Sequence, residues 1–171
     1  MLEHTKDHAR NHLIIRVLYA TGIRNAELRN LLVADLDFST GRLFVRAGKG
    51  DKDRYVLMDP DTLELLAEYT QGFPLEEPIF DISDATVNRA VKKAAKELGI
   101  HQRYKAIGRT FTAHSLRHAC ATHLYEAGMD PFQIKNLLGH HFLSTTLKYV
   151  HISLHQIAES YQAKHPLNKT L

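Results

Sequence analysis

The hydrophobic positions of the first thirty residues follow a helical repeat. Apolar side chains recur at intervals of three and four residues: Leu13, Ile14, Val17 and Leu18. This spacing places them on one face of a helix. Gly22 comes directly after the stripe, and glycine is typical of a helix end because it adopts left-handed backbone at low cost. A second, shorter helix is predicted over the next group: Glu27, Leu28, Leu31 and Leu32.

The apolar pattern then changes to the alternation of β-strands. Three pairs of alternating positions follow one another: Leu36 and Phe38, Leu43 and Val45, and Tyr55 and Leu57. Polar, glycine-containing segments at 39–41 and 48–51 separate the pairs and are typical of turns. The pattern therefore predicts a small three-stranded antiparallel sheet.

The rest of the chain has helical spacing and recognisable helix ends. Asp59 followed by Pro60 is typical of a helix start. A helix beginning at Ser83 or Asp84 is predicted to end at Gly99, and others are predicted at 113–127, 131–138, from 144 and from 154. The helix at 131–138 follows a capping-box-like start at Asp130 and Pro131 and is predicted to stop at Gly139. Their predicted apolar positions are Val87, Val91, Ala94, Leu98, Leu116, Cys120, Leu124, Ala127, Leu154, Ile157, Ala158 and Tyr161. The predicted fold is mainly α with one small sheet, in a single domain over 1–171.

Composition narrows the class of protein. The 171 residues are 44% hydrophobic and 24% charged, which suits one globular domain. No apolar run reaches the roughly 18 to 20 residues that a membrane span needs. The single cysteine, Cys120, cannot form an intrachain disulfide, so a reducing intracellular setting is the simplest interpretation. A net charge of +3 with a pI near 9.0 favours a polyanionic partner without identifying one.

Several polar residues occupy positions that packing does not require. Arg24 lies between a helix end and a helix start, and His114 and Arg117 have i, i+3 spacing on one helix. His140 follows a predicted helix end, and Tyr149 lies nine residues further on. Arginine, histidine, lysine and tyrosine without a carboxylate pair fit phosphoryl transfer that uses no metal. Guanidinium groups present paired donors to phosphate oxygens and neutralise the charge of the transition state.

Tyrosine is a poor nucleophile at neutral pH, because its pKa is about 10. It therefore needs a nearby base or a strong positive field. A covalent phosphotyrosine would keep the energy of the cleaved bond, so rejoining would need no ATP. A lysine could protonate the departing 5′ oxygen.

Four motifs in order resemble the boxes of tyrosine site-specific recombinases. They are T-G-I-R-N-A-E-L with Arg24, G-K-G-D-K-D-R with Lys49, A-H-S-L-R-H-A-C-A-T-H-L with His114 and Arg117, and L-L-G-H-H-F-L-S-T-T-L-K-Y-V-H with His140 and Tyr149. Each box alone is weak, but their order and spacing together are specific. The resemblance spans roughly residues 9–166, and the tail is similar to the end of Xer-type members.

The resemblance implies a role for each of these residues and no cofactor. Arg24 and Arg117 would clamp the scissile phosphate, and His140 would donate a further hydrogen bond to it. Lys49 would be the general acid and His114 the base that assists Tyr149. Glu27 would orient the clamp from behind. The expected product is a 3′-phosphotyrosyl intermediate with a free 5′ hydroxyl, followed by strand exchange through a Holliday junction.

These residues could also have structural roles in place of catalytic ones. Arg24 could simply pair with Glu27, and Lys52 competes with Lys49 for the role of general acid. His114 and His118 have i, i+4 spacing, but no H-E-x-x-H pattern or neighbouring carboxylate ligand accompanies them. We therefore expect no metal site. His118 and His123 are expected to be packing or surface residues.

The predicted helix at 83–98 has a basic outer face. Its members are Thr86, Arg89, Lys92, Lys93 and Lys96, and a second basic group follows at Arg103, Lys105 and Arg109. A solvated helix face would have the same composition. In the resembled family the corresponding helix enters the major groove. That would make Arg89 a base reader, with the lysines and the second group contacting the DNA backbone.

The resemblance also implies partners. It implies double-stranded DNA and a homotetramer on that DNA, with the last helix docked in its own domain or in a neighbour. It further implies a cytoplasmic, nucleoid-associated protein. Typical members carry an N-terminal core-binding domain, and this sequence begins where the catalytic domain would. Competing functions are type IB topoisomerase activity, a catalytically silent DNA-binding accessory factor and a metal-dependent helical enzyme.

Overall fold

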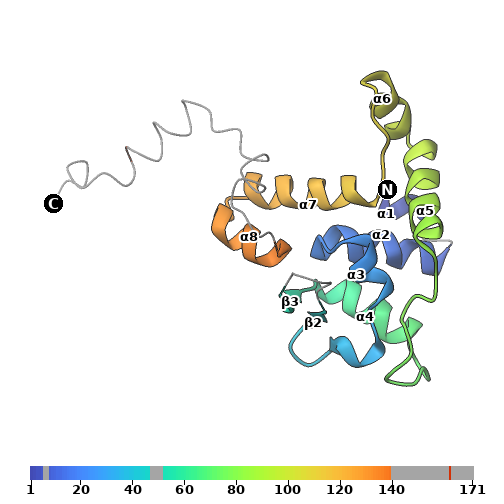
Figure 1. Ribbon diagram of the computed structural model, residues 1–171, viewed down its shortest axis with the longest axis vertical. Helices are drawn as coiled ribbons and strands as arrows, with labels where there is room; N and C mark the ends of the chain where they lie inside the picture. The colour runs from blue at the N-terminus through green and yellow to red at the C-terminus, as the bar shows by residue number, and fades with distance from the viewer. Residues whose placement is uncertain (6–7, 47–51, 140–161, 163–171) are drawn as a thin grey trace.

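The computed structural model describes residues 1–5, 8–46, 52–139 and 162, without the side chains of residues 3 and 4. The helices are α1 Leu2–Thr5, α2 Ala9–Thr21, α3 Asn25–Arg29, α4 Pro60–Tyr69, α5 Asp84–Glu97, α6 Ile100–Ala106, α7 Ala113–Glu126 and α8 Pro131–Leu138, with a 3-10 turn at Val33–Asp35. The strands are β1 Leu36–Asp37, β2 Arg42–Val45 and β3 Arg54–Leu57. Mainly helical structure with one three-stranded antiparallel sheet confirms the predicted fold class (Figure 1).

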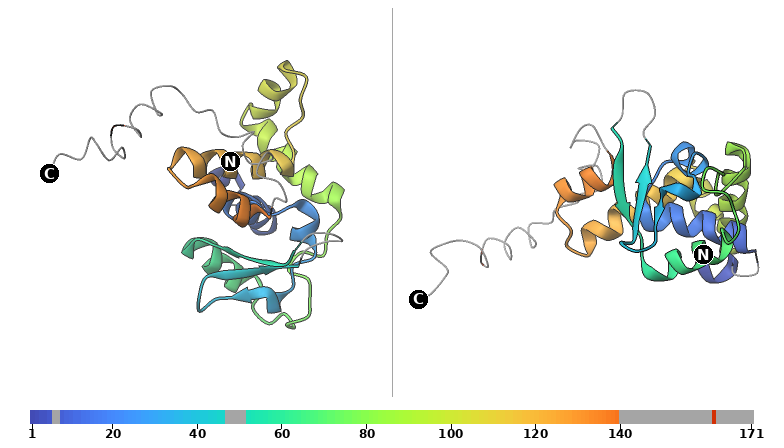
Figure 2. Two further views of the ribbon diagram at one scale, coloured as in Figure 1. Left: turned by 60° about the vertical axis from the view of Figure 1, so that its left-hand side comes forward. Right: turned by 90° about the horizontal axis from the view of Figure 1, so that it is seen from below.

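Helix α2 is the centre of the core. It contacts α1, α3, α4, α5 and α7, and its side chains Ile14, Val17 and Leu18 are completely buried. The sheet and α4 lie on one side of α2, and α7 lies on the other (Figure 2). The predicted apolar stripe is therefore buried on several sides, which fixes the end of α2 relative to its neighbours.

The sheet has the order β1-β2-β3 with antiparallel pairing. Leu43 pairs with Val56, and both are buried against the helices. Side chains that pair across antiparallel strands share a face, so Val56 follows Leu43 inward. Tyr55 and Leu57 do alternate as the pattern predicted, but on the solvent face, where they are 64% and 63% exposed.

Most predicted helix ends are confirmed. Gly22 ends α2 with φ 62°, and Gly139 ends α8 with φ 67°. The side chain of Asp59 caps α4 and that of Asp130 caps α8, each before a proline. Ser83 caps α5, where it accepts a hydrogen bond from the Thr86 amide.

Two predictions need correction and two fall outside the described residues. The second helix ends at Arg29, because Leu32 instead forms a β-bridge with Pro78. Helix α6 was not predicted. It has only seven residues, none of them fully buried, and only Ile100 and Tyr104 pack partly buried against the core. The predicted helices from 144 and from 154 lie outside the described residues. Within the described ranges, no helix is long and apolar enough to cross a membrane.

Candidate active site

A pocket of about 400 Å³ lies where the first turns of three helices meet. Arg24 and Asn25 line it from the start of α3, Asp84 from α5, and His114 and Arg117 from α7. The fold therefore brings Arg24 and Arg117 to one place although they are far apart in the sequence. His114 is exposed at the same pocket.

Arg24 is held at the start of α3 by Glu27. Its backbone N–H donates to Glu27 Oε2 at 2.7 Å, and its Nη1 donates to Glu27 Oε1 at 3.0 Å. Its Nη2 donates to the carbonyl of Gly139 at 3.2 Å. The side chain remains 37% exposed, so the guanidinium is fixed and still open to an incoming anion.

Arg117 is buried beneath the pocket and is only 3% exposed. Its Nη1 donates to the Gly22 carbonyl at 2.6 Å, and its Nη2 donates to the Leu138 carbonyl at 2.7 Å. Both carbonyls belong to helix ends, where backbone groups lack helical partners. Arg117 therefore joins the end of α2 to the end of α8.

Glu27 is buried and receives two guanidinium groups. Besides Arg24 it accepts hydrogen bonds from Nη1 and Nη2 of Arg54 at 2.8 and 3.0 Å. Burial raises the pKa of Glu27, but the hydrogen bonds and charges of Arg54 and Arg24 outweigh burial and hold the pKa below its ordinary value. The carboxylate is therefore charged at neutral pH.

Arg54 is a site residue that sequence reasoning missed. It is the last letter of the motif assigned to Lys49, and it precedes the first apolar residue of β3. Its partner Glu27 lies in another element, so no periodic pattern connects the two. The one available indication is a charged residue at the start of a strand, which is also common on solvent faces.

Polar side chains also connect the helix starts around the pocket. Asn25 Nδ2 donates to Asp84 Oδ1 at 2.8 Å, and Asn88 Nδ2 donates to Asp84 Oδ2 at 3.0 Å. Asn88 Oδ1 in turn accepts the backbone N–H of Ala113 at the start of α7. These contacts, which the sequence did not predict, fix α3, α5 and α7 relative to one another.

Three of the six expected catalytic residues lie outside the described residues: Lys49, His140 and Tyr149. The end of α8 is described, and Gly139 directly precedes His140. Among the described residues, no group of three or more His, Cys, Asp or Glu side chains could hold a metal ion. The pKa of His118 is lowered by burial and then by the positive charges of His114 and Arg109.

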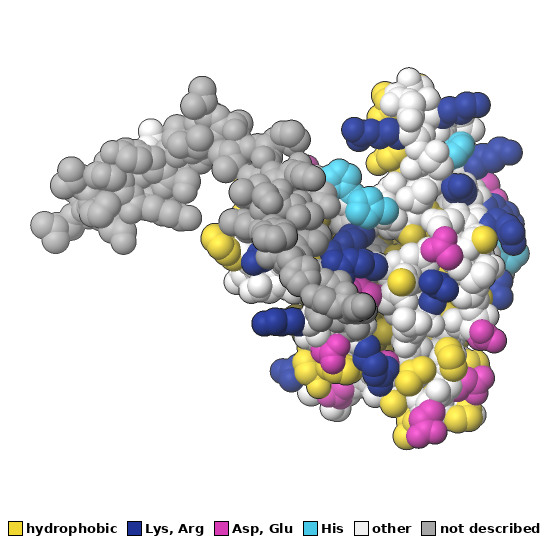
Figure 3. Space-filling view, viewed as in Figure 1, with side chains coloured by type: hydrophobic (Ala, Val, Ile, Leu, Met, Phe, Trp, Pro, Cys, Tyr) yellow, Lys and Arg dark blue, Asp and Glu magenta, His cyan; other side chains and the backbone are white. Residues whose placement is uncertain are grey.

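The residues expected to bind DNA lie mostly in solvent. Arg89, Lys92, Lys93 and Lys96 of α5 are exposed, as are Arg103, Lys105 and Arg109 in and after α6. Thr86 is half-buried, and its hydroxyl lies 3.0 Å from that of Ser83 at the start of α5. Figure 3 shows Lys and Arg side chains gathered along α5 and α6.

Comparison with known proteins agrees with this geometry. The model of the phage integrase family matches residues 1–155. The tyrosine recombinase XerC of Pelobacter propionicus is 36% identical over 165 residues, which are 94% of this chain and 54% of the relative. The chain thus spans about half the length of the curated relatives it matches.

Solved structures show the same fold. The crystal structure of XerA recombinase has a TM-score of 0.75 at 31% identity, covering 96% of this chain and 61% of that one. XerH site-specific recombinase bound to difH substrate, in a pre-cleavage complex, has a TM-score of 0.75 at 27% identity, covering 92% and 47%. The pocket, its arginines and these comparisons lead to one conclusion: the chain belongs to the phage integrase family of tyrosine recombinases.

Proposed function

We propose that residues 1–171 form the catalytic domain of a site-specific DNA recombinase. The observation that carries the proposal is the convergence of Arg24 and Arg117 on one pocket, beside a Gly139 that leads into His140. Two guanidiniums at one pocket suit a phosphodiester with no metal, because each can donate to non-bridging oxygens. Binding of a scissile phosphate there would exchange carbonyl contacts for phosphate contacts.

The proposed chemistry is the one that the resemblance to tyrosine recombinases implies. Tyr149 attacks the phosphorus, the bond to the 5′ oxygen breaks, and Lys49 supplies the proton to that oxygen. His114 assists the loss of the tyrosine proton, and His140 donates to the phosphate with the arginines. The products are a 3′-phosphotyrosyl bond and a 5′ hydroxyl, and attack by the hydroxyl of a partner strand reverses the step. Repeated on a second strand pair, this exchange passes through a Holliday junction.

The partner is double-stranded DNA, with α5 in the major groove. A helix turns by about 100° per residue, so Lys92 and Lys93 lie about 60° and 40° to either side of Arg89. That arrangement points Arg89 at base edges and the two lysines at opposite backbones. We further propose a tetramer on DNA, with the last helix docked within its protomer or exchanged in trans, and a cytoplasmic, nucleoid-associated location.

The test traps the covalent intermediate without assuming a DNA site. The protein is incubated in EDTA with nicked duplexes whose cores are randomised, then denatured in SDS, and the trapped DNA is sequenced. Wild type should yield adducts and Tyr149→Phe none, and the sequences would define the site. Adducts with both proteins would mean that the nucleophile is another residue.

Two further results separate the competing functions. Relaxation of supercoiled plasmid without joining of the selected sites would favour a type IB topoisomerase. DNA binding with no adduct from wild type on any duplex would favour a catalytically silent binding factor and contradict the proposal.

A further inference from the structure

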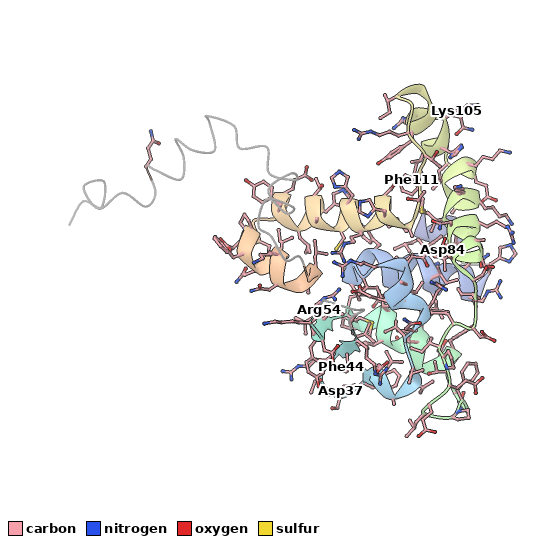
Figure 4. All side chains as sticks on the ribbon, viewed as in Figure 1. Asp37, Phe44, Arg54, Asp84, Lys105 and Phe111 are labelled. Atoms are coloured by element: carbon pink, nitrogen blue, oxygen red, sulfur yellow. The ribbon has the colours of Figure 1, made fainter. Side chains whose placement is uncertain are left out.

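The side chain of Arg54 on β3 is only 9% exposed, and its guanidinium donates hydrogen bonds to two residues. Nη1 and Nη2 donate to the two oxygens of Glu27, and Nε donates to the Leu137 carbonyl at 3.0 Å. A planar fork is needed for this arrangement, since lysine has one ammonium and cannot occupy all three positions. Figure 4 shows Arg54 on β3 beside the end of α8.

Glu27 connects Arg54 to Arg24, one of the two arginines expected to bind the scissile phosphate. The same carboxylate that accepts the fork of Arg54 accepts the backbone N–H and Nη1 of Arg24. A buried carboxylate with one cationic partner removed would lose much of the compensation for its desolvation. A shift of Arg54 would therefore move the Glu27 carboxylate, and with it the guanidinium of Arg24.

Three arginines also share the end of α8. Arg54 donates to the carbonyl of Leu137, Arg117 to that of Leu138, and Arg24 to that of Gly139. These consecutive carbonyls carry the partial negative charge of a helix C-terminus, which favours cations. The arginines come from three different elements, so they fix this helix end relative to β3, α3 and α7.

Gly139 leaves the space that the guanidinium of Arg54 occupies. A Cβ atom on Gly139 would lie 2.9 Å from Cζ and Nη1 of Arg54, well inside contact distance. The guanidinium thus lies against the glycine backbone immediately before His140. A side chain at this position would require the guanidinium of Arg54 to shift from its contacts with Glu27 and Leu137.

We propose that Arg54 is a positioning residue of the recombinase site. It holds Glu27 so that Arg24 faces the pocket, and it fixes the helix end from which the segment with His140 continues. It does not touch the DNA. The inference rests on the proposed function, and it adds a residue outside the six expected to act on the phosphate.

The test compares Arg54→Lys with Arg16→Lys. Arg16 is a matched control because it is also largely buried, donates to Thr62 at 2.8 Å and pairs with Asp59 at 2.9 Å, joining α2 to α4 away from the pocket. Urea unfolding of both variants reports the loss of stability. All further measurements are made where both are fully folded.

The first measurement needs no activity. The pKa of the Glu27 carboxyl is followed by NMR in the full chain. It should rise toward its ordinary value in Arg54→Lys and stay low in Arg16→Lys. An unchanged pKa in Arg54→Lys would overturn the proposal, because Arg54 would then not be holding Glu27.

The second measurement uses the DNA site recovered in the trapping experiment. Single-turnover cleavage by Arg54→Lys should fall by about 10²-fold, the usual effect of a small misplacement of reacting groups, while the Kd for DNA changes less than twofold. Cleavage equal to that of Arg16→Lys would make Arg54 merely structural. If wild type forms no adduct, the proposed function fails instead, and the pKa measurement still decides whether Arg54 holds Glu27.

Discussion

At the scale of single residues, Gly22 shows how one missing side chain sets the site. Its φ of 62° ends α2, and its carbonyl accepts the Nη1 of Arg117. A Cβ atom there would lie 2.4 Å from Leu138 Cδ2 and 3.3 Å from Cys120 Sγ. The close approach of α7 and α8 to the end of α2 therefore depends on glycine for both conformation and space.

We expect Gly22→Ala to cost about 1 to 3 kcal/mol more stability than Gly72→Ala, the range typical of overpacking. Gly72 is the matched control, because its φ is 84° and a Cβ there would meet nothing within 4 Å. Both variants therefore bear backbone strain, and only the first meets a steric clash. Urea unfolding of the two variants measures the difference, and equal losses would show that α8 can move away without cost.

The residues of the site differ in how far the sequence could predict them. Arg24 and Arg117 stood in recognisable motifs, and their position at one pocket agrees with the resemblance. Arg54 and the Asn25–Asp84–Asn88 contacts could not be found in this way. Their partners lie in other elements, and a pair of charges or amides at a distance leaves no repeat along the chain.

At the scale of elements, α8 owes its place to its two ends. Eight residues are too few for a helix that is stable alone. The Asp130 side chain accepts from the amides of Phe132 and Gln133, and Ile134 and Leu138 are buried against the neighbouring Ala121. The other end presents the carbonyls that the three arginines bind. The cap at Asp130 therefore stabilises the helix whose C-terminal carbonyls accept hydrogen bonds from Arg24, Arg54 and Arg117.

Asp130→Ala should lower the free energy of unfolding by about 0.5 to 2 kcal/mol, the usual value of an N-cap. Asp130→Asn is the control, because the amide oxygen keeps the same acceptor and asparagine caps nearly as well. Urea unfolding of the three proteins at one pH measures both changes. A loss with Asn as large as that with Ala would mean that the charge of Asp130 matters and its capping hydrogen bonds do not.

The elements that the sequence predicted well are those with local determinants. The capping residues Asp59, Ser83 and Asp130 act within one turn of their helices, as do the glycines at helix ends. Spacing along the sequence therefore reveals them. Helix α6 has seven residues and only Ile100 and Tyr104 partly buried against the core, so its apolar pattern is too short to detect. The outward direction of Tyr55 depends on the register with β2, which is a property of two strands and not of one.

At the scale of the whole molecule, charge is distributed unevenly despite a net value of only +3. Exposed basic side chains line α5 and α6, while α4 exposes Asp61, Glu64 and Glu68. Such an asymmetry directs a polyanion to one face, and it does so more strongly at low salt. The pocket opens between α5 and α7, so a duplex along α5 would pass the arginine clamp.

Lys92→Gln and Lys93→Gln should each weaken the dependence of log K on log salt by about 0.9, the value of one phosphate contact on duplex DNA. Arg42→Gln is the charge-matched control, since exposed Arg42 is the first residue of β2 and not part of α5. Arg89→Gln should instead cost about 1 to 3 kcal/mol on the selected site and little on random DNA, because a base contact discriminates between sequences. Fluorescence anisotropy over about 50 to 200 mM salt measures all four variants. If only one of the two lysine variants changes the slope of log K against log salt, α5 lies along a single DNA backbone. In that position Arg89 would not contact base edges in the major groove.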